Sequence, residues 1–171
     1  MIKILASVAV AFTLVSAALV APAAAAEDAR RAALAVLPIK LLDTSQEPTD
    51  QSAEHARRLA AMAEALARDL KRTGAYEDTV LIARQAISDA CPQETSACLF
   101  AAAKARGASF VFVGVVQKSS MLIMQMSARI VAVETGSVVI SRALSFRGDN
   151  DEAWARAEAF LVREFAERKR D

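Results

Sequence analysis

Residues 109–118 read SFVFVGVVQK, a run in which phenylalanine and valine place apolar side chains on both faces of an extended chain. A strand that is apolar on both faces is typical of the centre of a sheet that helices cover on each side. Strand-like and helix-like patterns alternate in the sequence before this run. The run therefore predicts an α/β fold with residues 109–118 near the middle of the sheet.

Two further strands and a long helix are expected before the central strand. Residues 34–39 form the first strand, with Pro38 near its end because proline cannot donate to an interior ladder. A polar loop over 43–49 leads to a helix from about Ser52 to Arg72, where apolar residues recur at helical spacing. Residues 79–83 form the second strand, and a short helix over 97–106 follows it.

An antiparallel hairpin is expected after the central strand, formed by residues 121–133 and 137–147. Glu134-Thr135-Gly136 suits a three-residue loop that ends on a glycine in the left-handed region. This loop sets the register, and the apolar residues then fall on one face. The expected cross-strand pairs are Ile130 with Ile140, Met126 with Leu144, and Met124 with Phe146.

The last helix is expected to begin at a cap formed by Asp149 or Asn150, with Glu152 completing a capping box. Its predicted core stripe consists of Trp154, Ala157, Phe160, Leu161 and Phe165. The order is strand-helix-strand-helix-strand-strand-strand-helix. We expect a single α/β domain over 27–171, with its core at about 33–167, and a mixed five-stranded sheet flanked by helices, parallel first and antiparallel at the end.

Residues 1–26 have the order of a cleavable signal peptide: a short basic start, an apolar run over 4–20 and an alanine-rich end. Cleavage is expected after Ala26, with Ala23 as the second choice. A membrane anchor is the alternative, which the helix-breaking Pro22 disfavours. No cysteine lies at the expected cleavage site, which argues against a lipoprotein anchor. The prediction is therefore a soluble periplasmic protein with no stable membrane span after cleavage.

Charge argues against nucleic acid as a partner. The chain has 21 lysines and arginines and 20 aspartates and glutamates, and one of those bases, Lys3, lies in the predicted signal peptide. The mature part is therefore formally neutral and has no basic stripe.

The two cysteines, Cys91 and Cys98, lie close together in the mature part. In an oxidising compartment such a pair predicts a disulfide. The alternative, a redox or metal site, fits less well, because this spacing matches neither C-x-x-C oxidoreductases nor paired zinc motifs.

Short segments of the chain resemble a known group of envelope domains. The segments are the opening strand AVLPI at 35–39, GASFVFVGVV at 107–116, and the strand that runs into Val133-Glu134-Thr135-Gly136. They look like the α/β domain shared by the amino-terminal part of the Tol-Pal translocation protein, the curli secretion lipoprotein and the lipoprotein activators of penicillin-binding proteins. More closely, the chain resembles a family of exported proteobacterial proteins of unknown function, in which a cysteine pair precedes the glycine-alanine strand. The resemblance implies this fold and a role in binding envelope proteins.

Chemistry-bearing motifs are missing from the sequence. It contains no G-x-S-x-G, H-E-x-x-H, P-loop or G-x-G-x-x-G, and its one histidine, His55, is expected to be a solvated helix residue. Residues 149–152 are acidic, but a helix cap is favoured over a calcium loop. Met121, Met124 and Met126 raise copper as an alternative, yet core packing is favoured. We expect no enzyme, no catalytic residue, no cofactor and no metal site.

Arg142 stands out because it falls in the apolar series of the last strand. Either it reaches past a sheet edge to water, or it binds an anionic ligand or a partner's carboxylate. Arg129 on the preceding strand is the second candidate for binding a partner. The sequence predicts a non-enzymatic periplasmic accessory protein that binds an envelope or periplasmic protein. A small-ligand or metal-binding protein is the alternative.

Overall fold

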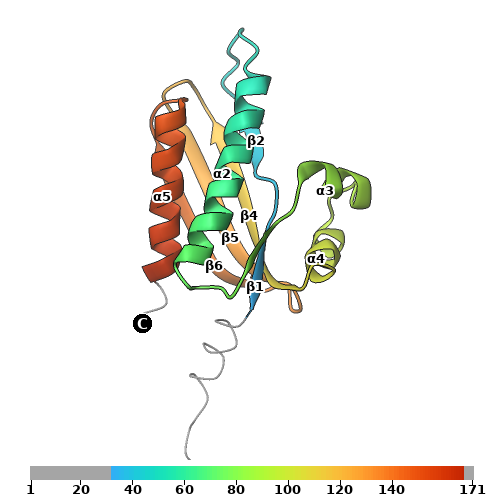
Figure 1. Ribbon diagram of the computed structural model, residues 1–171. Helices are drawn as coiled ribbons and strands as arrows, with labels where there is room; N and C mark the ends of the chain where they lie inside the picture. Colours follow the sequence, from blue (N-terminus) through green and yellow to red (C-terminus); the bar gives the residue numbers. More distant parts are fainter. Residues whose placement is uncertain (1–31, 168–171) are drawn as a thin grey trace, which may run out of the picture.

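The computed structural model describes residues 32–167, which form one α/β domain (Figure 1). The expected signal peptide and its cleavage sites lie outside the described residues. The elements in chain order are β1 (Ala33–Val36), β2 (Lys40–Asp43), α2 (Ser52–Arg72), β3 (Thr79–Leu81), α3 (Arg84–Ala90), α4 (Ser96–Lys104), β4 (Ala108–Lys118), β5 (Met124–Ala132), β6 (Val138–Phe146) and α5 (Asp151–Glu167).

The sheet confirms the predicted topology around its central strand. Its order is β3-β1-β4-β5-β6, and β2 also pairs with β4. β3, β1 and β4 are parallel, whereas β4, β5 and β6 are antiparallel. The run at 109–118 is thus the central strand, with Phe112 and Val111 fully buried on opposite faces.

The first strand is interrupted at Pro38, which differs from the prediction. β1 pairs with Ala108–Phe112 and β2 with Val115–Lys118, so both run along β4 in the same direction. Proline has no N–H to donate, so the ladder breaks there and the chain resumes as a separate short strand. No element was predicted for residues 40–42, and a polar loop was predicted from Asp43; β2 instead adds a sixth strand to the sheet.

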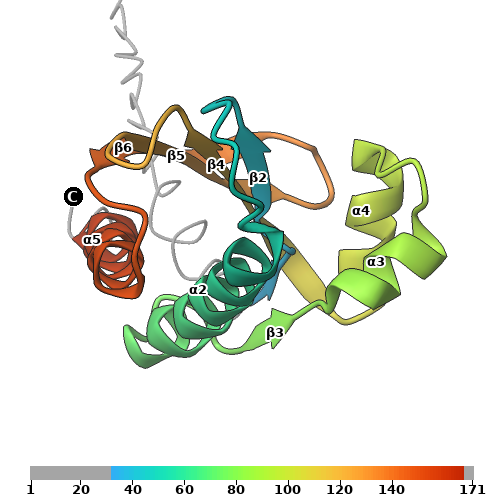
Figure 2. The same ribbon diagram turned by 90° about the horizontal axis from the view of Figure 1, so that it is seen from above.

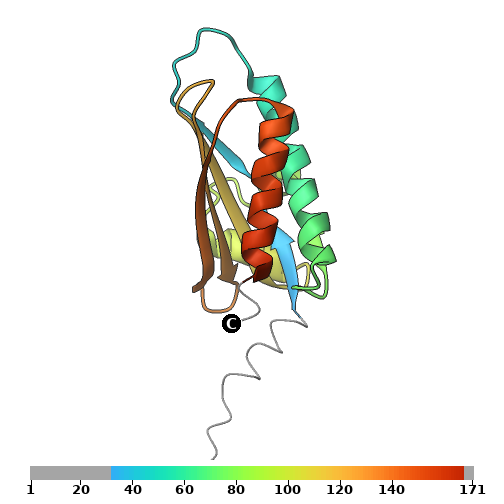
Figure 3. The same cartoon turned by 90° about the vertical axis from the view of Figure 1, so that its left-hand side faces the viewer.

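Two layers of helices cover the sheet (Figures 1 and 2). α2 and α5 lie side by side on one face, where Leu66 and Leu161 are fully buried in the larger core (Figure 3). α3 and α4 cover the other face near β1 and β4, over a smaller core that includes Ile87 and Val111. The sequence pattern did not predict α3, because its seven residues are too few for a helical period to emerge.

The predicted hairpin register is confirmed, since Ile130, Met126 and Met124 pair with Ile140, Leu144 and Phe146. Gly136 has a φ of 67°, the left-handed conformation that the turn requires. β5 begins three residues later than expected, at Met124. The residues before it, 121–123, form a loop instead.

The start of α5 is capped by Asn150, whose side-chain oxygen accepts a hydrogen bond from the Ala153 N–H at 3.0 Å. Glu152 does not complete the expected capping box, because its carboxylate pairs with Arg156 one turn later. Most of the predicted core stripe is buried, with Phe160 as the exception at 39% exposed. The stripe is therefore narrower than the sequence suggested.

Candidate functional site

Three connections meet at one end of the domain, which we call the loop end: 44–51, 119–123 and 147–150 (Figure 1). The connection between β4 and β5 carries three consecutive exposed apolar side chains. Met121 is 57% exposed, Leu122 69% and Ile123 50%. An apolar group of this kind on a soluble domain is a candidate contact surface. We call these three residues the apolar tip.

Backbone hydrogen bonds hold the apolar tip in place. The N–H of Asp149 donates to the Met121 carbonyl at 3.0 Å, and the N–H of Ser119 donates to the Ile123 carbonyl at 3.0 Å. The Ser120 hydroxyl accepts further bonds from the N–H groups of Leu122 and Ile123. The tip side chains are therefore presented to solvent by an ordered turn that is attached to the start of α5.

A buried ammonium lies directly beneath the apolar tip. Lys118 ends β4, and its side chain is only 1% exposed. Its Nζ lies 2.6 Å from the Gln51 amide oxygen, 2.9 Å from Glu47 Oε2 and 3.2 Å from Asp149 Oδ2. Burial alone would lower the pKa of Lys118, but hydrogen bonds to Glu47 and Asp149 raise it above its ordinary value. Lys118 thus stays charged and joins all three connections.

Asp149 is the second centre of this network, and its side chain is 3% exposed. Its Oδ2 lies 2.7 Å from His55 Nε2, while its Oδ1 accepts from Arg58 at 3.0 Å and from the Trp154 indole N–H at 3.1 Å. Burial would raise the pKa of Asp149, but hydrogen bonds from His55, Trp154 and Lys118 hold it below its ordinary value. We call Lys118, Asp149 and their partners the charged brace.

The expectation that His55 is solvated is wrong. His55 is 4% exposed, because it lies in the first turn of α2 on the same buried face as Leu59 and Met62. Its partner Asp149 is 94 residues away in the chain, so no local pattern could have paired them. Both oxygens of Asp149 are used for contacts within the charged brace. This arrangement is suited to fixing the loops at the loop end in place.

The two arginines predicted as binding candidates are far from the apolar tip in the fold. Arg142 lies half-buried on β6, the strand at the edge of the sheet, and its Nε donates to Glu164 of α5 at 3.1 Å. Arg129 is exposed on β5, on the sheet face opposite to α2 and α5, and faces Ser141 across the ladder. The structure does not bring the two arginines together.

The predicted disulfide is present. Cys91 and Cys98 are joined at an S–S distance of 2.06 Å and link the end of α3 to α4. Thr95 caps α4 by accepting a hydrogen bond from the Cys98 N–H. Cys91 is 1% exposed within the smaller core. The disulfide therefore fixes the two helices that cover the second face of the sheet.

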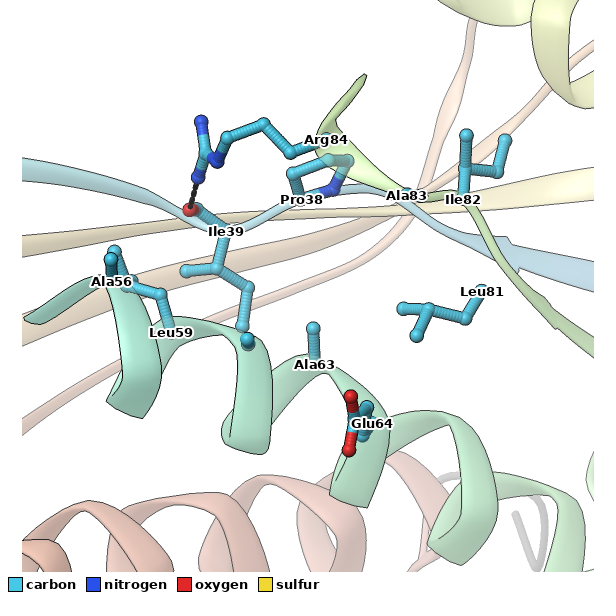
Figure 4. Close-up of a pocket in the computed structure, with 11 residues that line it drawn as sticks. Pro38, Ile39, Ala56, Leu59, Ala63, Glu64, Leu81, Ile82, Ala83 and Arg84 are labelled. Carbon is cyan, nitrogen blue, oxygen red and sulfur yellow. Dashed lines mark hydrogen bonds between the residues drawn. The ribbon is translucent and has the colours of Figure 1, made fainter. Parts of the chain in front are cut away.

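A pocket lies where β1 and β3 end, beside the first half of α2 (Figure 4). Its volume is about 230 Å³, and its walls are mainly apolar, including Ile39, Leu59 and Ala63. Arg84 approaches it and donates to the Ile39 carbonyl at 2.9 Å, which satisfies an oxygen left over by the break at Pro38. The carboxyl ends of parallel strands commonly hold ligands, but here the Arg84 guanidinium is already engaged; the other charged side chain of the lining is Glu64.

Within residues 32–167, no group of three or more histidine, cysteine or acidic side chains is placed to hold a metal ion. None of the helices in that range is both long enough and apolar enough to cross a membrane.

The apolar tip is not predicted from the sequence, because a single strand is expected over 121–133. Met121, Leu122 and Ile123 are three apolar residues in succession, whereas a strand with one wet face alternates. This break in alternation was the available indication of a loop. A lysine at the end of an otherwise apolar strand, Lys118, was the corresponding indication of a buried ion pair.

Comparisons with known proteins agree with this fold. A family model described as "Protein of unknown function (DUF2380)" matches residues 32–165. None of the curated proteins compared with the chain matches it.

Among solved structures, the PelC dodecamer from Paraburkholderia phytofirmans is 15% identical, with a TM-score of 0.52 over 80% of this chain and 86% of that one. The C-terminal domain of LpoB from Salmonella enterica is 16% identical, with a TM-score of 0.41 over 67% and 81%. TolB from Acinetobacter baumannii is 12% identical, with a TM-score of 0.42 over 77% of this chain and 28% of its own. The likeness to PelC concerns the fold alone.

Proposed function

The chain belongs to the DUF2380 family of proteins of unknown function, and we propose that it is a non-catalytic interaction protein of the cell envelope. It docks a partner protein by inserting the apolar tip, Met121, Leu122 and Ile123, into an apolar socket. The observation that carries this proposal is the combination of three exposed apolar side chains with a turn that is held rigid. Pre-ordered apolar groups lose little conformational entropy on binding, which favours affinity.

Charge at the loop end supports a protein partner with a basic rim around its socket. Exposed acidic side chains outnumber exposed basic ones at and beside the loop end: Asp43, Asp50, Glu54 and Asp151 against Arg57 and Arg147. Complementary charge around an apolar contact guides association and selects partners. An anionic lipid surface would be repelled by the same charges, so a membrane is the less suitable occupant.

The disulfide supports an oxidising compartment, because such bonds persist outside the cytoplasm. The charged brace supports a binding role, because its buried groups contact one another and fix the loops that present the tip. Location in the envelope and the lack of catalysis are both parts of the proposal.

Photo-crosslinking in intact cells tests the docking surface. A photoreactive phenylalanine analogue replaces Leu122, and a matched control carries it at Leu81, an apolar residue that is 41% exposed on β3 at the far edge of the sheet. We expect one reproducible protein adduct from position 122 and none from position 81. Serine at Met121 and Ile123 should abolish the adduct.

The purified partner then provides the quantitative test. Leu122→Ser should weaken its binding at least tenfold, because an anchoring side chain is lost. Added salt should weaken binding further, because the rim charges are screened. An adduct with a lipid, or no adduct at position 122, would overturn the proposal. So would an adduct with a second copy of the chain, which would indicate self-assembly, the state in which PelC was solved.

A further inference from the structure

A groove runs between α2 and α5 on the outer side of the helical layer, where the two helices lie side by side (Figure 3). Its volume is about 320 Å³. Three alanines, Ala61, Ala65 and Ala155, leave room between the helices, and Met62 and Trp154 also line it. Apolar atoms form most of its exposed wall, and five charged residues also line it: Arg57, Arg58, Arg68, Asp151 and Glu158.

One charged side chain of this groove has a buried oxygen without a hydrogen-bond partner. Glu158 of α5 is 5% exposed, and its Oε1 is buried with no hydrogen-bond partner among the described residues. A buried acceptor without a donor destabilises the fold, and an ionised one does so more strongly. Packing therefore does not account for a carboxyl group at this position, where leucine or glutamine would fill similar space.

The three arginines that line the groove do not supply the missing donor. Arg57 and Arg58 bind the Asp151 carboxylate at 2.8 and 2.9 Å, and Arg58 also binds Asp149. Arg68 lowers the pKa of Glu158 through its charge, but no hydrogen bond joins the two in the described structure. Glu158 Oε1 is therefore left without a donor from the described residues, on a side chain that lines the groove.

We propose that the α2–α5 groove binds an aliphatic ammonium group, of the kind carried by a lysine side chain or an alkyl diamine. The ammonium contacts Glu158, and the methylene stem lies against Ala61, Ala65 and Ala155. An ammonium is a compact point charge with three donors, which suits a confined carboxylate better than the planar fork of a guanidinium. The stem of a lysine is apolar and packs well on methyl groups.

The pH dependence of this site follows from its surroundings. Burial raises the pKa of Glu158 to about 7, with Asp69 adding to the rise, while Arg68 and Arg72 oppose it. These are the charged groups of α2 that act on it. Because a neutral carboxylic acid attracts a cation weakly, amine binding should strengthen as Glu158 ionises between pH 6 and pH 8.

NMR titration of the whole chain tests the proposal. The probes are Nα-acetyl-lysine methylamide and cadaverine, and the matched control is Nα-acetyl-norleucine methylamide, which has the stem without the charge. We expect both amines to shift the resonances of Ala61, Ala65 and Ala155, and the control to have little effect. Glu158→Gln, which keeps the shape and should fold, should weaken amine binding at least tenfold.

Two further variants sharpen the test. At pH 9, where Glu158 is ionised even after its pKa rises further, Arg68→Gln should strengthen amine binding, because it removes a competing cation. Leu122→Ser should leave it unchanged, which separates this site from the apolar tip. Equal binding of the amines and the norleucine control, or equal affinity of Glu158→Gln and the wild type, would overturn the proposal. A stronger response to the lysine derivative indicates a protein ligand, and a stronger response to cadaverine a free amine.

Discussion

Two carboxylates of similar burial, Asp149 and Glu158, lie in opposite electrostatic situations. Asp149 lies two residues before α5. Its side chain is 3% exposed and contacts His55, Arg58, Lys118 and Trp154. Glu158, within α5, is 5% exposed and has an unpartnered oxygen. Hydrogen bonds outweigh burial and lower the pKa of Asp149, whereas burial and Asp69 raise that of Glu158. Burial alone therefore does not reveal whether a charge serves the fold.

The difference suggests two roles for buried charge in one small domain. The charged brace joins loops that are distant in sequence, so its removal should cost stability. Within the described residues, the buried oxygen of Glu158 makes no hydrogen bond that would hold the fold together. Replacing this carboxyl group should therefore increase stability. Variants at each position can separate these roles.

The largest expected effect is the loss of Asp149. Asp149→Ala removes one of the two carboxylates next to the buried Lys118 ammonium and also the acceptor that His55 and Arg58 share, so we expect the free energy of unfolding to fall by about 3–5 kcal/mol. Chemical denaturation measures this, with Asp151→Ala as the control at a nearby carboxylate that is 61% exposed. If both variants lost equally little stability, the charged brace would not hold the loops.

Glu158→Gln should change the free energy of unfolding in the opposite direction, that is, it should stabilise the protein. The raised pKa means that the folded state holds the proton more tightly than the unfolded state, so this group lowers stability as pH rises from about 4.5 to about 7. At pH 8 we expect the variant to be more stable by roughly 2 kcal/mol, and at pH 4 similar to wild type. Thermal unfolding across pH measures this, with the exposed Glu152→Gln as control. An unchanged profile would contradict the unpartnered state of Glu158.

His55→Gln should produce a smaller loss. An amide can keep one hydrogen bond to Asp149, so we expect the free energy of unfolding to fall by only about 1 kcal/mol. Denaturation midpoints measure this, with Gln85→Ala as an exposed control on α3. A loss as large as that of Asp149→Ala would mean that His55, and not Lys118, is the main partner of the carboxylate.

Arg142→Ala should have the smallest effect. The Arg142–Glu164 pair is 29% and 32% exposed, so water screens it, and we expect a loss below about 1 kcal/mol. Arg129→Ala serves as the control for an arginine on the open sheet face. If Arg142→Ala keeps its melting temperature and yet abolishes partner binding, Arg142 belongs to the docking surface in addition to the tip.

The fold was largely predictable because its determinants are local. Apolar side chains on both faces of 109–118 indicated the central strand, and the Glu134-Thr135-Gly136 turn set the hairpin register. β2 was missed because four residues carry too little pattern, and Pro38 suggested that the strand had ended. The disulfide was predictable from cysteine spacing and the expected compartment.

The candidate site was much less predictable, because its contacts join distant parts of the chain. Lys118 meets Glu47 across 71 residues, and His55 meets Asp149 across 94. No period or motif encodes such pairs, so His55 was assigned to solvent and Asp149 only to a helix cap. Glu158 also has no distinguishing sequence context, since its unpartnered state depends on how α2 and α5 pack.

The central strand separates the apolar tip from the start of the described chain. β4 begins beside Ala33 and ends at Lys118, just before the tip, and the last turn of α5 lies at the same end as Ala33 (Figure 1). Its 11 residues, at about 3.3 Å each, place the tip about 35 Å from that end. A domain that is attached to a surface through either end of residues 32–167 would therefore present its apolar tip on the side away from that surface. Sensor surfaces and affinity tags attached there should leave docking unobstructed.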